Sequence, residues 1–449
     1  MVHRLLLMAL LNCLLVSIGQ AQDPQEDRNP DPLTLEEAIR IGLENNFSIR
    51  IARNRAEISD NNRTIGNAGF LPELTATGSR TESVENSLTE FSGDAIPDRD
   101  VTGARSSNTS ASASLNWTIF DGLGMFTTYE RLSELEKLGD IEARLAIENN
   151  IAQIIVAYFN IIRQQNIADV LQSTVELSEQ RIQIAETMKD LGSGSEYDLL
   201  QARADLNADR AAVIRQEVSV NDAMVLLNEL IGREVDTRFA VGGQIPVNDQ
   251  LNYDEIVTNA LSGNLRLAIA KANQRVTELQ IREIEAERYP EIALNLGYGY
   301  NLNESGSGFL ELSRSTGFNY GVTARITLFD GFDINLRKQN ARIQLKNQQL
   351  TFEQQKLQVN ADIRSEFTRY LKSLQLVELE RENLVYARQT VEIALERFKL
   401  GTINSIELRE AQRTLIDAES RLIQAQFEAK TAETELLRLT GILGEDRKS

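Results

Sequence analysis

Apolar and polar residues alternate along several short stretches of this chain, as they do in β-strands. In "IALNLGYGY", which begins at Ile292, one face carries large apolar residues and the other carries Ala, Asn and Gly. A period of two with small or polar partners is typical of membrane β-strands, and a half-buried strand of a soluble sheet is the alternative. The alternation predicts strands at about 72–82, 108–120, 290–301 and 316–329.

The period becomes helical after the second and fourth of these strands. Leu132, Leu135 and Leu138 are spaced by three, and no proline interrupts 122–191 or 331–400. Each of these ranges can form one helix of roughly 100 Å at 1.5 Å per residue. Such a length indicates coiled-coil packing with the returning helices, which are rich in alanine. We therefore expect long helices at 122–191, 196–231, 331–400 and 405–440, and a soluble rod is the alternative.

The chain repeats its own order of signals. "LTLEEAIRIGLENN" at 33–46 resembles "LNYDEIVTNALSGN" at 251–264, an offset of 251 − 33 = 218. "WTIFDG" at 117–122 resembles "ITLFDG" at 326–331, an offset of 326 − 117 = 209 that holds to the end of each half. The predicted organisation is a first repeat at 33–240, a linker or equatorial region at 241–250, and a second repeat at 251–449.

The first residues are typical of an export signal. "MVHR" is a short basic start, "LLLMALLNCLLVSI" is an apolar core, and "GQA" is a small-residue cleavage site. We therefore predict a signal peptide at 1–21, followed by a tail at 22–32. The apolar core is too short for a membrane-spanning helix of about 20 residues, and no later apolar run is expected to approach that length. The exported chain is then either soluble or a β-barrel protein.

Removing the signal peptide limits the available chemistry. His3 and Cys13, the only His and Cys of the chain, are removed with it. The mature chain therefore excludes Cys or His nucleophiles and His-ligated zinc, and we predict neither a metal nor another cofactor. Arg4 is also lost, so the mature net charge is (47 − 1) − 66 = −20. This acidity argues against a nucleic acid partner, which requires clustered Lys and Arg.

The number of predicted strands implies an assembly. A membrane sheet must close on itself, because each unpaired edge group in hydrocarbon costs several kcal/mol. Known barrels begin at about eight strands, so four strands do not close alone. Several chains would have to pool their strands around a polar, wet interior. Their helical hairpins would then continue that interior as a tube.

These features together resemble the TolC-type outer-membrane efflux family. The resemblance rests on the signal peptide, the duplicated halves, the Pro-containing strand entries, "WTIFDG" and "ITLFDG", and the "LG" turns, and it covers nearly the whole mature chain. It implies an α+β membrane protein: a homotrimer with one shared 12-stranded β-barrel in outer-membrane lipid, continued by an α-helical periplasmic barrel. It also implies a passive exit duct that docks to a periplasmic adaptor and an inner-membrane transporter.

The turns after the two long helices are candidate contact sites. Gly192 and Gly401 suit the left-handed residue beyond a helix end. Ser195-x-x-Asp198 and Asn404-x-x-Glu407 both resemble capping boxes. The resemblance places these turns at the tunnel tip, where adaptor hairpins dock. It gives as candidate contacts Gly192, Ser193, Asp198, Gly401 and Thr402, although turn geometry alone also explains the glycines.

The resemblance further suggests an acidic ring at the entrance. In similar proteins, acidic residues lie six and nine positions after the second turn glycine, which here are Glu407 and Glu410. Six carboxylates around a three-fold axis would attract cations. The alternative is structural, because Glu407 fits a capping position and Glu410 fits a solvated helix face. Phe398 and Ile403 depart from the family, since polar gate-linking side chains can occur there.

The repeated Phe-Asp-Gly motif is predicted to be the junction between barrel and tunnel. Its residues are Phe120, Asp121, Gly122, Phe329, Asp330 and Gly331. The aromatic residue suits the membrane–water boundary, the aspartate can cap the following helix, and the glycine allows a sharp change of path. Two other functions compete with the export duct: a structural periplasmic coiled-coil protein, and a carboxylate-pair hydrolase.

Overall fold

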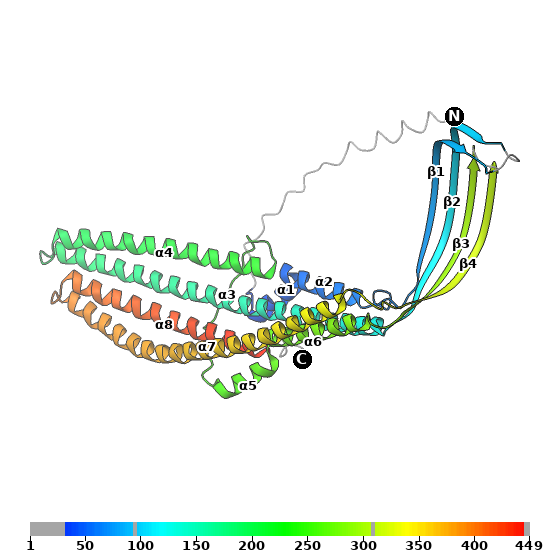
Figure 1. Cartoon of the computed structure of the whole chain (residues 1–449). Coiled ribbons are helices and arrows are strands. Elements are labelled where there is room, and N and C mark those ends of the chain that lie inside the picture. The colour runs from blue at the N-terminus through cyan, green and yellow to red at the C-terminus, as the bar shows by residue number, and fades with distance from the viewer. Residues whose placement is uncertain (1–31, 93–96, 307–309, 444–449) are drawn as a thin grey trace, which may run out of the picture.

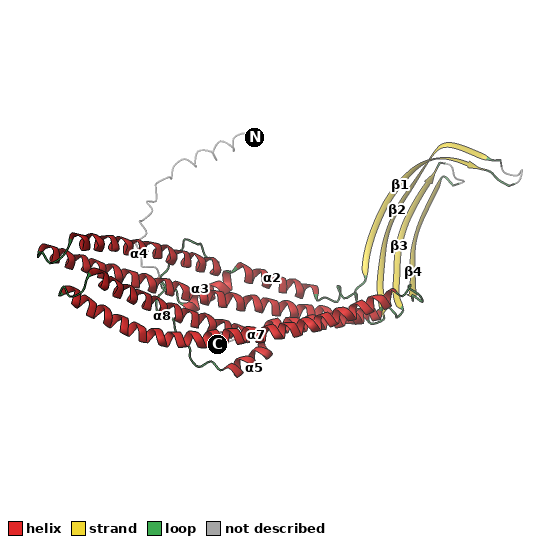
Figure 2. Cartoon of the chain, turned by 60° about the vertical axis from the view of Figure 1, so that its left-hand side comes forward, coloured by secondary structure: helices red, strands yellow, loops and turns green. Residues whose placement is uncertain are grey.

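The computed structural model describes residues 32–92, 97–306 and 310–443. The predicted signal peptide and all of the tail except residue 32 lie outside these residues. The chain forms an elongated layer of helices that is continued at one end by a long, curved sheet (Figures 1 and 2). All secondary-structure bounds below refer to the described residues.

Each half contributes two shorter and two longer helices. In the first half these are α1 (Leu35–Asn45), α2 (Phe47–Asn62), α3 (Gly124–Asp190) and α4 (Glu196–Ile231), and in the second half α5 (Tyr253–Gly263), α6 (Leu265–Ala286), α7 (Asp333–Lys399) and α8 (Ser405–Thr440). The helices α3 and α7 have 67 residues each, which corresponds to about 100 Å. They begin two residues later than the predicted starts at 122 and 331, because the residues before them have left-handed backbone.

The duplication is visible in the helix bounds and in the capping contacts. The start of α5 follows that of α1 by 253 − 35 = 218, and the start of α7 follows that of α3 by 333 − 124 = 209. Asn46 caps α2 and donates from Nδ2 to the Leu230 carbonyl at 2.8 Å. Asn264 caps α6 and donates in the same way to Leu439 at 2.9 Å. Both halves therefore anchor a short helix on the end of a long one.

An ion pair between the long helices repeats with its charges exchanged. Glu179 of α3 accepts from Arg210 of α4 at 2.7 Å, and Arg388 of α7 donates to Glu419 of α8 at 3.0 Å. The positions correspond at the same offset, since 179 + 209 = 388 and 210 + 209 = 419. The predicted ungapped register therefore extends to contacts between helices.

The four strands form one antiparallel sheet in the order β1 (Glu73–Thr89), β2 (Arg99–Asp121), β3 (Glu291–Ser305) and β4 (Leu312–Arg325). The first three strands extend farther from the helices than the predicted ranges. In these outer parts, β1 and β2 carry charged side chains that weaken the apolar–polar alternation in the sequence. The ladder between the two strands nevertheless continues to Thr89 and Arg99.

The fourth strand is shorter than predicted at its other end. It stops at Arg325, and the residues 326–329 of "ITLF" lie outside the ladder. Arg325 pairs with Glu291, the first residue of β3, so β3 offers no partner to the residues that follow. Leu328 and Phe329 are 91% and 73% exposed in the single chain.

The two faces of the sheet differ in chemistry. On one face, hydroxyl pairs join β1 and β2 at 2.7–2.8 Å: Thr75–Ser114, Thr77–Ser112 and Ser79–Ser110. On the other face, the ladder aligns Leu74, Leu115, Leu296 and Tyr320 in one row. Leu74 is 72% exposed and Tyr320 is 78% exposed, and the sheet projects away from the helices (Figure 1). An apolar face left open in this way disfavours the half-buried soluble sheet.

The helical core lies under a belt, which we define as α1, α5 and residues 239–251. The first part of the belt packs on α3 and α4 through residues such as Ile39 and Phe239. Its second part packs on α7 and α8 through Ile256 and Ala260. The four long helices lie side by side in the order α4, α3, α8, α7. The belt therefore covers one face of a single helical layer.

One prediction about apolar runs was wrong. By length and composition, α3 is apolar enough to cross a membrane, the one such helix in the described part of the chain. However, 61% of its apolar window is buried within the protein. The residues around Ile151–Ile162 are covered by α1 and α4, so the run serves the core of the helical layer.

Candidate functional site

The end of the helical layer farthest from the sheet carries two similar turns (Figure 1). Gly192 and Gly401 have φ of +77° and +69°, which confirms the predicted left-handed residues. The hydroxyl of Ser193 donates to the Met188 carbonyl at 3.1 Å, and that of Thr402 donates to Arg397 at 3.0 Å. These side chains thereby satisfy carbonyl groups at the ends of α3 and α7.

The helices that leave the two turns have polar caps. Ser195 Oγ accepts from the Asp198 N–H at 3.1 Å and donates to the Asp198 carboxylate at 2.6 Å. Asn404 Oδ1 accepts from the N–H groups of Ile406 and Glu407 at 3.0 and 2.9 Å. The caps occur where the spacing predicted them. Asp198 bonds to the hydroxyl of its cap, whereas a full capping box would use the main-chain N–H.

An exposed groove lies between the two turns. It has a volume of about 410 Å³ and is lined by Ile184, Met188 and Leu191 from the first hairpin and by Leu400 and Gly401 from the second. Leu191 and Leu400 are 78% and 76% exposed. The glycines in the sequence predicted the turns but not the apolar lining of the groove. The leucine directly before each of these glycines was the signal that could have indicated it.

Glu407 and Glu410 lie in the first turns of α8. Both are exposed, while the neighbouring Leu408 and Ala411 are buried. The structure records no ion pair or side-chain hydrogen bond for either carboxylate among the described residues. Two uncompensated acidic groups three residues apart therefore face solvent on one side of the helix.

Arg409, between these two acids, points the other way. It donates two hydrogen bonds to Asp209 of α4 at 2.8 and 2.6 Å, and Asp209 also accepts from Ser178 of α3 at 2.6 Å. The Asp209 side chain is 9% exposed, and its hydrogen bonds raise the pKa of Arg409. This contact joins the second hairpin to the first. The sequence analysis missed it because the partners are 200 residues apart.

The junction between sheet and helices has the same unusual backbone in both halves. Gly122 and Gly331 have φ of +71° and +68°, and they are followed by Leu123 and Phe332 at +69° and +70°. Positive φ in a large non-Gly residue costs about 1–3 kcal/mol and persists only where surrounding structure enforces it. A Cβ on Gly122 would lie 2.3 Å from the Ala286 carbonyl oxygen, so only glycine fits there.

The two aspartates of the junction differ. Asp330 accepts hydrogen bonds from the N–H groups of Phe332 and Ile334, both at 2.9 Å, and the bonds hold the pKa of Asp330 below its usual value. The predicted capping is thus present at the start of α7. The structure records no such bond for Asp121, whose Oδ1 is buried without a partner among the described residues.

Aromatic side chains gather at the same level. Phe329 packs edge-on against Phe332, with ring centroids 5.4 Å apart, and Phe120 pairs with Ile292 in the ladder. Trp117 donates from Nε1 to the Phe70 carbonyl at 2.8 Å. Amphipathic rings of this kind suit a membrane–water boundary.

One protein-family model matches both halves of the chain. The sequence matches the model of the outer membrane efflux protein family over residues 38–233 and 256–442. The chain belongs to this family. It is therefore a channel protein of the outer membrane with a large periplasmic part, through which cargo leaves the cell. The structural coiled-coil alternative is not favoured.

Individual relatives agree with the family over most of the chain. Protein CyaE of Bordetella pertussis is 23% identical, with 94% of this chain and 86% of the relative covered. Outer membrane efflux protein BepC of Brucella suis is 20% identical, with 92% and 86% covered. The Campylobacter jejuni CmeC outer membrane channel has the same fold, with a TM-score of 0.73 at 14% identity and coverage of 93% and 90%. These relatives are channel proteins, which disfavours the hydrolase.

The carboxylates do not gather into an obvious metal site. Across residues 32–92, 97–306 and 310–443, no group of three or more His, Cys, Asp or Glu side chains is placed to hold a metal ion.

Proposed function

We propose that three copies of this chain close edge to edge into one exit duct. The first support is the sheet, whose outer strands β1 and β4 each have an unpaired edge. Joining β4 of one copy to β1 of the next satisfies both edges, and 3 × 4 strands give a barrel of 12. The hydroxyl-bearing face then surrounds water, and the face with Leu74 and Tyr320 meets outer-membrane lipid.

The helical layer supplies a second, independent support. At the end near the sheet, α2 and α7 are the outermost helices, on opposite sides of α3 and α6. Both carry exposed apolar stripes at coiled-coil spacing: Phe47, Ile51 and Ile58 on α2, and Leu336, Ile343, Leu350 and Leu357 on α7. Packing these two different edges together would give a heterologous interface, which forms a ring when the rotation between copies closes, as a closed barrel requires.

The tip of the ring is the proposed docking point for a periplasmic adaptor. The groove is exposed, and the apolar side chains of Leu191 and Leu400 on it suit the apolar ridge of a partner helix. The adaptor would link the duct to an inner-membrane transporter, which supplies the energy for a passive channel. Gly192, Ser193, Asp198, Gly401 and Thr402 surround this point. Glu407 and Glu410 would ring the entrance around the three-fold axis.

Cross-linking between opposite edges of the chain tests the ring. Gly139 of α3 lies against Ser59 of α2, and 139 + 209 = 348 gives the equivalent level of α7. Ile58→Cys on α2 and Leu350→Cys on α7 are therefore at similar heights on opposite edges. The mature chain has no other cysteine.

Oxidation of the double variant in outer membranes should yield covalent dimers and trimers on a denaturing gel, with nothing larger. Each single variant is the matched control and should remain monomeric on the gel. A ladder that continues beyond three chains, or the absence of cross-links, would contradict the ring.

A further inference from the structure

A cavity opens on the face of the helical layer that the belt leaves uncovered. It has a volume of about 870 Å³ and is lined by residues of α3, α4, α6, α7 and α8. On α3, Ile151, Ile155 and Tyr158 pack toward the belt, whereas Asn149 and Gln153 line the cavity. Volumes of about 300–1,000 Å³ are usual for sites that bind small molecules.

One wall of the cavity is charged. It contains Arg266, Arg369 and Arg438, together with the acidic Glu366 and Glu435, and the carboxylates of Glu148 and Asp362 also act on Arg438. A guanidinium of this wall that has no acidic partner attracts anions, which the strongly acidic remainder of the mature chain repels.

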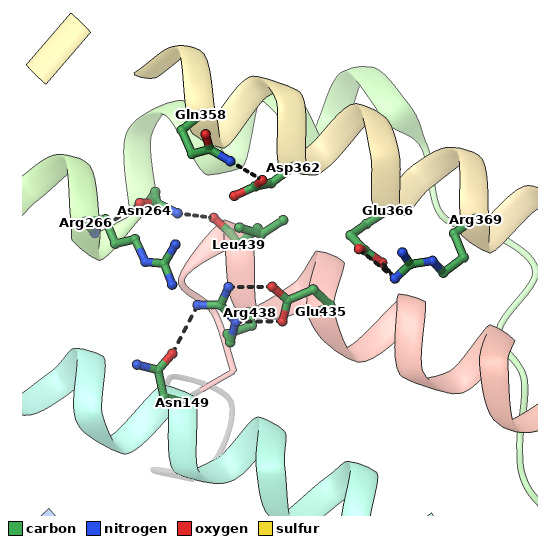
Figure 3. A network of polar contacts seen from close by, with 10 residues as sticks. All are labelled: Asn149, Asn264, Arg266, Gln358, Asp362, Glu366, Arg369, Glu435, Arg438 and Leu439. Atoms are coloured by element: carbon green, nitrogen blue, oxygen red, sulfur yellow. Dashed lines mark hydrogen bonds and ion pairs between the residues drawn. The ribbon is translucent and has the colours of Figure 1, made fainter. Parts of the chain in front are cut away.

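The three arginines are not equivalent (Figure 3). Arg438 bonds to Glu435 and donates to Asn149 at 3.1 Å, and Arg369 is paired with Glu366 at 2.8 Å. For the guanidinium of Arg266, the structure records no ion pair or hydrogen bond within the described ranges.

Figure 3 shows Arg266 extending from α6 toward Arg438. Arg438 is 9% exposed, so its guanidinium is largely desolvated. Arg438 is already compensated by Glu435, with Glu148 and Asp362 nearby, so the guanidinium that is left to bind an anion is that of Arg266. An anion there would accept charge-assisted hydrogen bonds.

Another part of the cavity lining is apolar. It is formed by Val156 of α3, Leu226 and Leu230 of α4, and Phe427 of α8. Leu226 is 45% exposed in the chain. A cavity that combines an apolar lining with the guanidinium of Arg266, unpaired among the described residues, suits molecules that have an apolar body and an anionic head.

We propose that this cavity is a binding site for amphiphilic organic anions. The carboxylate or sulfonate head binds to Arg266, and the apolar body lies along Leu226 and Leu230. The inference rests on the proposed ring. A belt inside the ring would obstruct the passage, so the belt lies outside and the cavity faces the passage, where it holds anionic cargo in transit.

The test uses the full mature protein in nanodiscs of zwitterionic lipid, with the signal from protein-free nanodiscs subtracted. The probes are dansylglycine, which has an apolar body and a carboxylate, and dansylglycinamide, which has the same body without the charge. Fluorescence titration should show saturable binding of dansylglycine, at least about tenfold tighter than binding of the amide.

Arg266→Gln should weaken dansylglycine binding about tenfold, to the level of the amide, and Arg266→Lys should weaken it less. Leu226→Asn should weaken binding of both probes. Arg40→Gln is the matched control, because Arg40 lies on the belt with a 60% exposed side chain, and it should change nothing.

If the unaltered protein bound the two probes with equal affinity, that result alone would overturn the proposal. So would the absence of saturable binding, or unchanged binding in Arg266→Gln. The cysteine cross-link reports the ring separately. A ring without anion binding therefore refutes the site alone, whereas loss of the ring refutes the proposed function.

Discussion

Replacing Arg409 by methionine should loosen the contact between the two hairpins near the tip. Arg409 of α8 makes two hydrogen bonds to Asp209 of α4, and Ser178 of α3 bonds to the same carboxylate. The Arg409 and Asp209 side chains are only 19% and 9% exposed. Arg409→Met keeps the apolar stem of the side chain and removes its charge, so Asp209 stays buried without its cation.

The expected magnitude follows from this burial. Hydrogen bonds to charged groups contribute about 1.5–3 kcal/mol each, and removing one partner of a buried ion pair costs about 3–5 kcal/mol. Because the pair is not fully buried, we expect the lower end, about 3 kcal/mol. At about 1.4 kcal/mol per factor of ten, the equilibrium for local opening rises about a hundredfold.

Hydrogen exchange with mass spectrometry measures this opening. Amides of α4 near Asp209 and of α8 near Arg409 should exchange about a hundredfold faster in Arg409→Met, because exchange follows the population of the open form. The control is Arg203→Met, which breaks the exposed Arg203–Glu186 pair between α3 and α4 and should change exchange less than about fivefold.

The double variant Asp209→Leu, Arg409→Met should recover most of the protection, since an apolar pair replaces a buried ion pair at little cost. Unchanged exchange in Arg409→Met would refute the view that this ion pair holds the hairpins together. An equal effect of Arg203→Met would refute the argument from burial.

Three further outcomes are expected. Glu410→Gln should lower the cation preference of single channels without changing helix content, and unchanged selectivity in both Glu410→Gln and Glu407→Gln would refute the acidic ring. Gly122→Ala should lower the Tm more than Gly331→Ala, because both have positive φ but only Gly122 lies against a carbonyl oxygen of α6; equal effects would contradict this steric argument. Asp330→Ala should lower the Tm at neutral pH but not in acid. The capping bonds depress the pKa of Asp330 in the folded state. The stabilisation by its carboxylate is therefore present above the pKa of the unfolded chain and is lost as pH falls through the pKa of the folded protein; a Tm difference between the two proteins that does not change with pH would contradict the capping role.

The long helices were predictable because their signals are local. The absence of proline and the spacing of Leu132, Leu135 and Leu138 define α3, and Gly192 marks its end. The repeat offsets, read from weak similarity, agree with the starts of α5 and α7. Local chemistry thus determines most of the helical architecture.

The strand ends were less predictable. The outer parts of β1 and β2 carry charged residues such as Arg80 and Glu82, which obscure the apolar alternation. At the other end of the sheet, "TLF" alternates well but finds no partner strand in its own chain. Pairing, which is a property of the fold, decides where a strand ends.

The contacts between halves were not predictable from one sequence. Asp209 and Arg409 are charged residues in alanine-rich helices, where a solvated face is the usual interpretation. The cavity with Arg266 and Arg438 combines residues of five helices, and only the contact between the start of α6 and the end of α8 brings the two arginines near each other. Such sites depend on tertiary geometry that has no local signature.

The central claim is that the chain forms a trimeric channel in the outer membrane. The most direct measurement is to extract the protein from outer membranes, determine its detergent-corrected mass, and record the same preparation in a planar bilayer. We predict a mass of three mature chains and discrete conductance steps. A monomer without conductance would contradict the account.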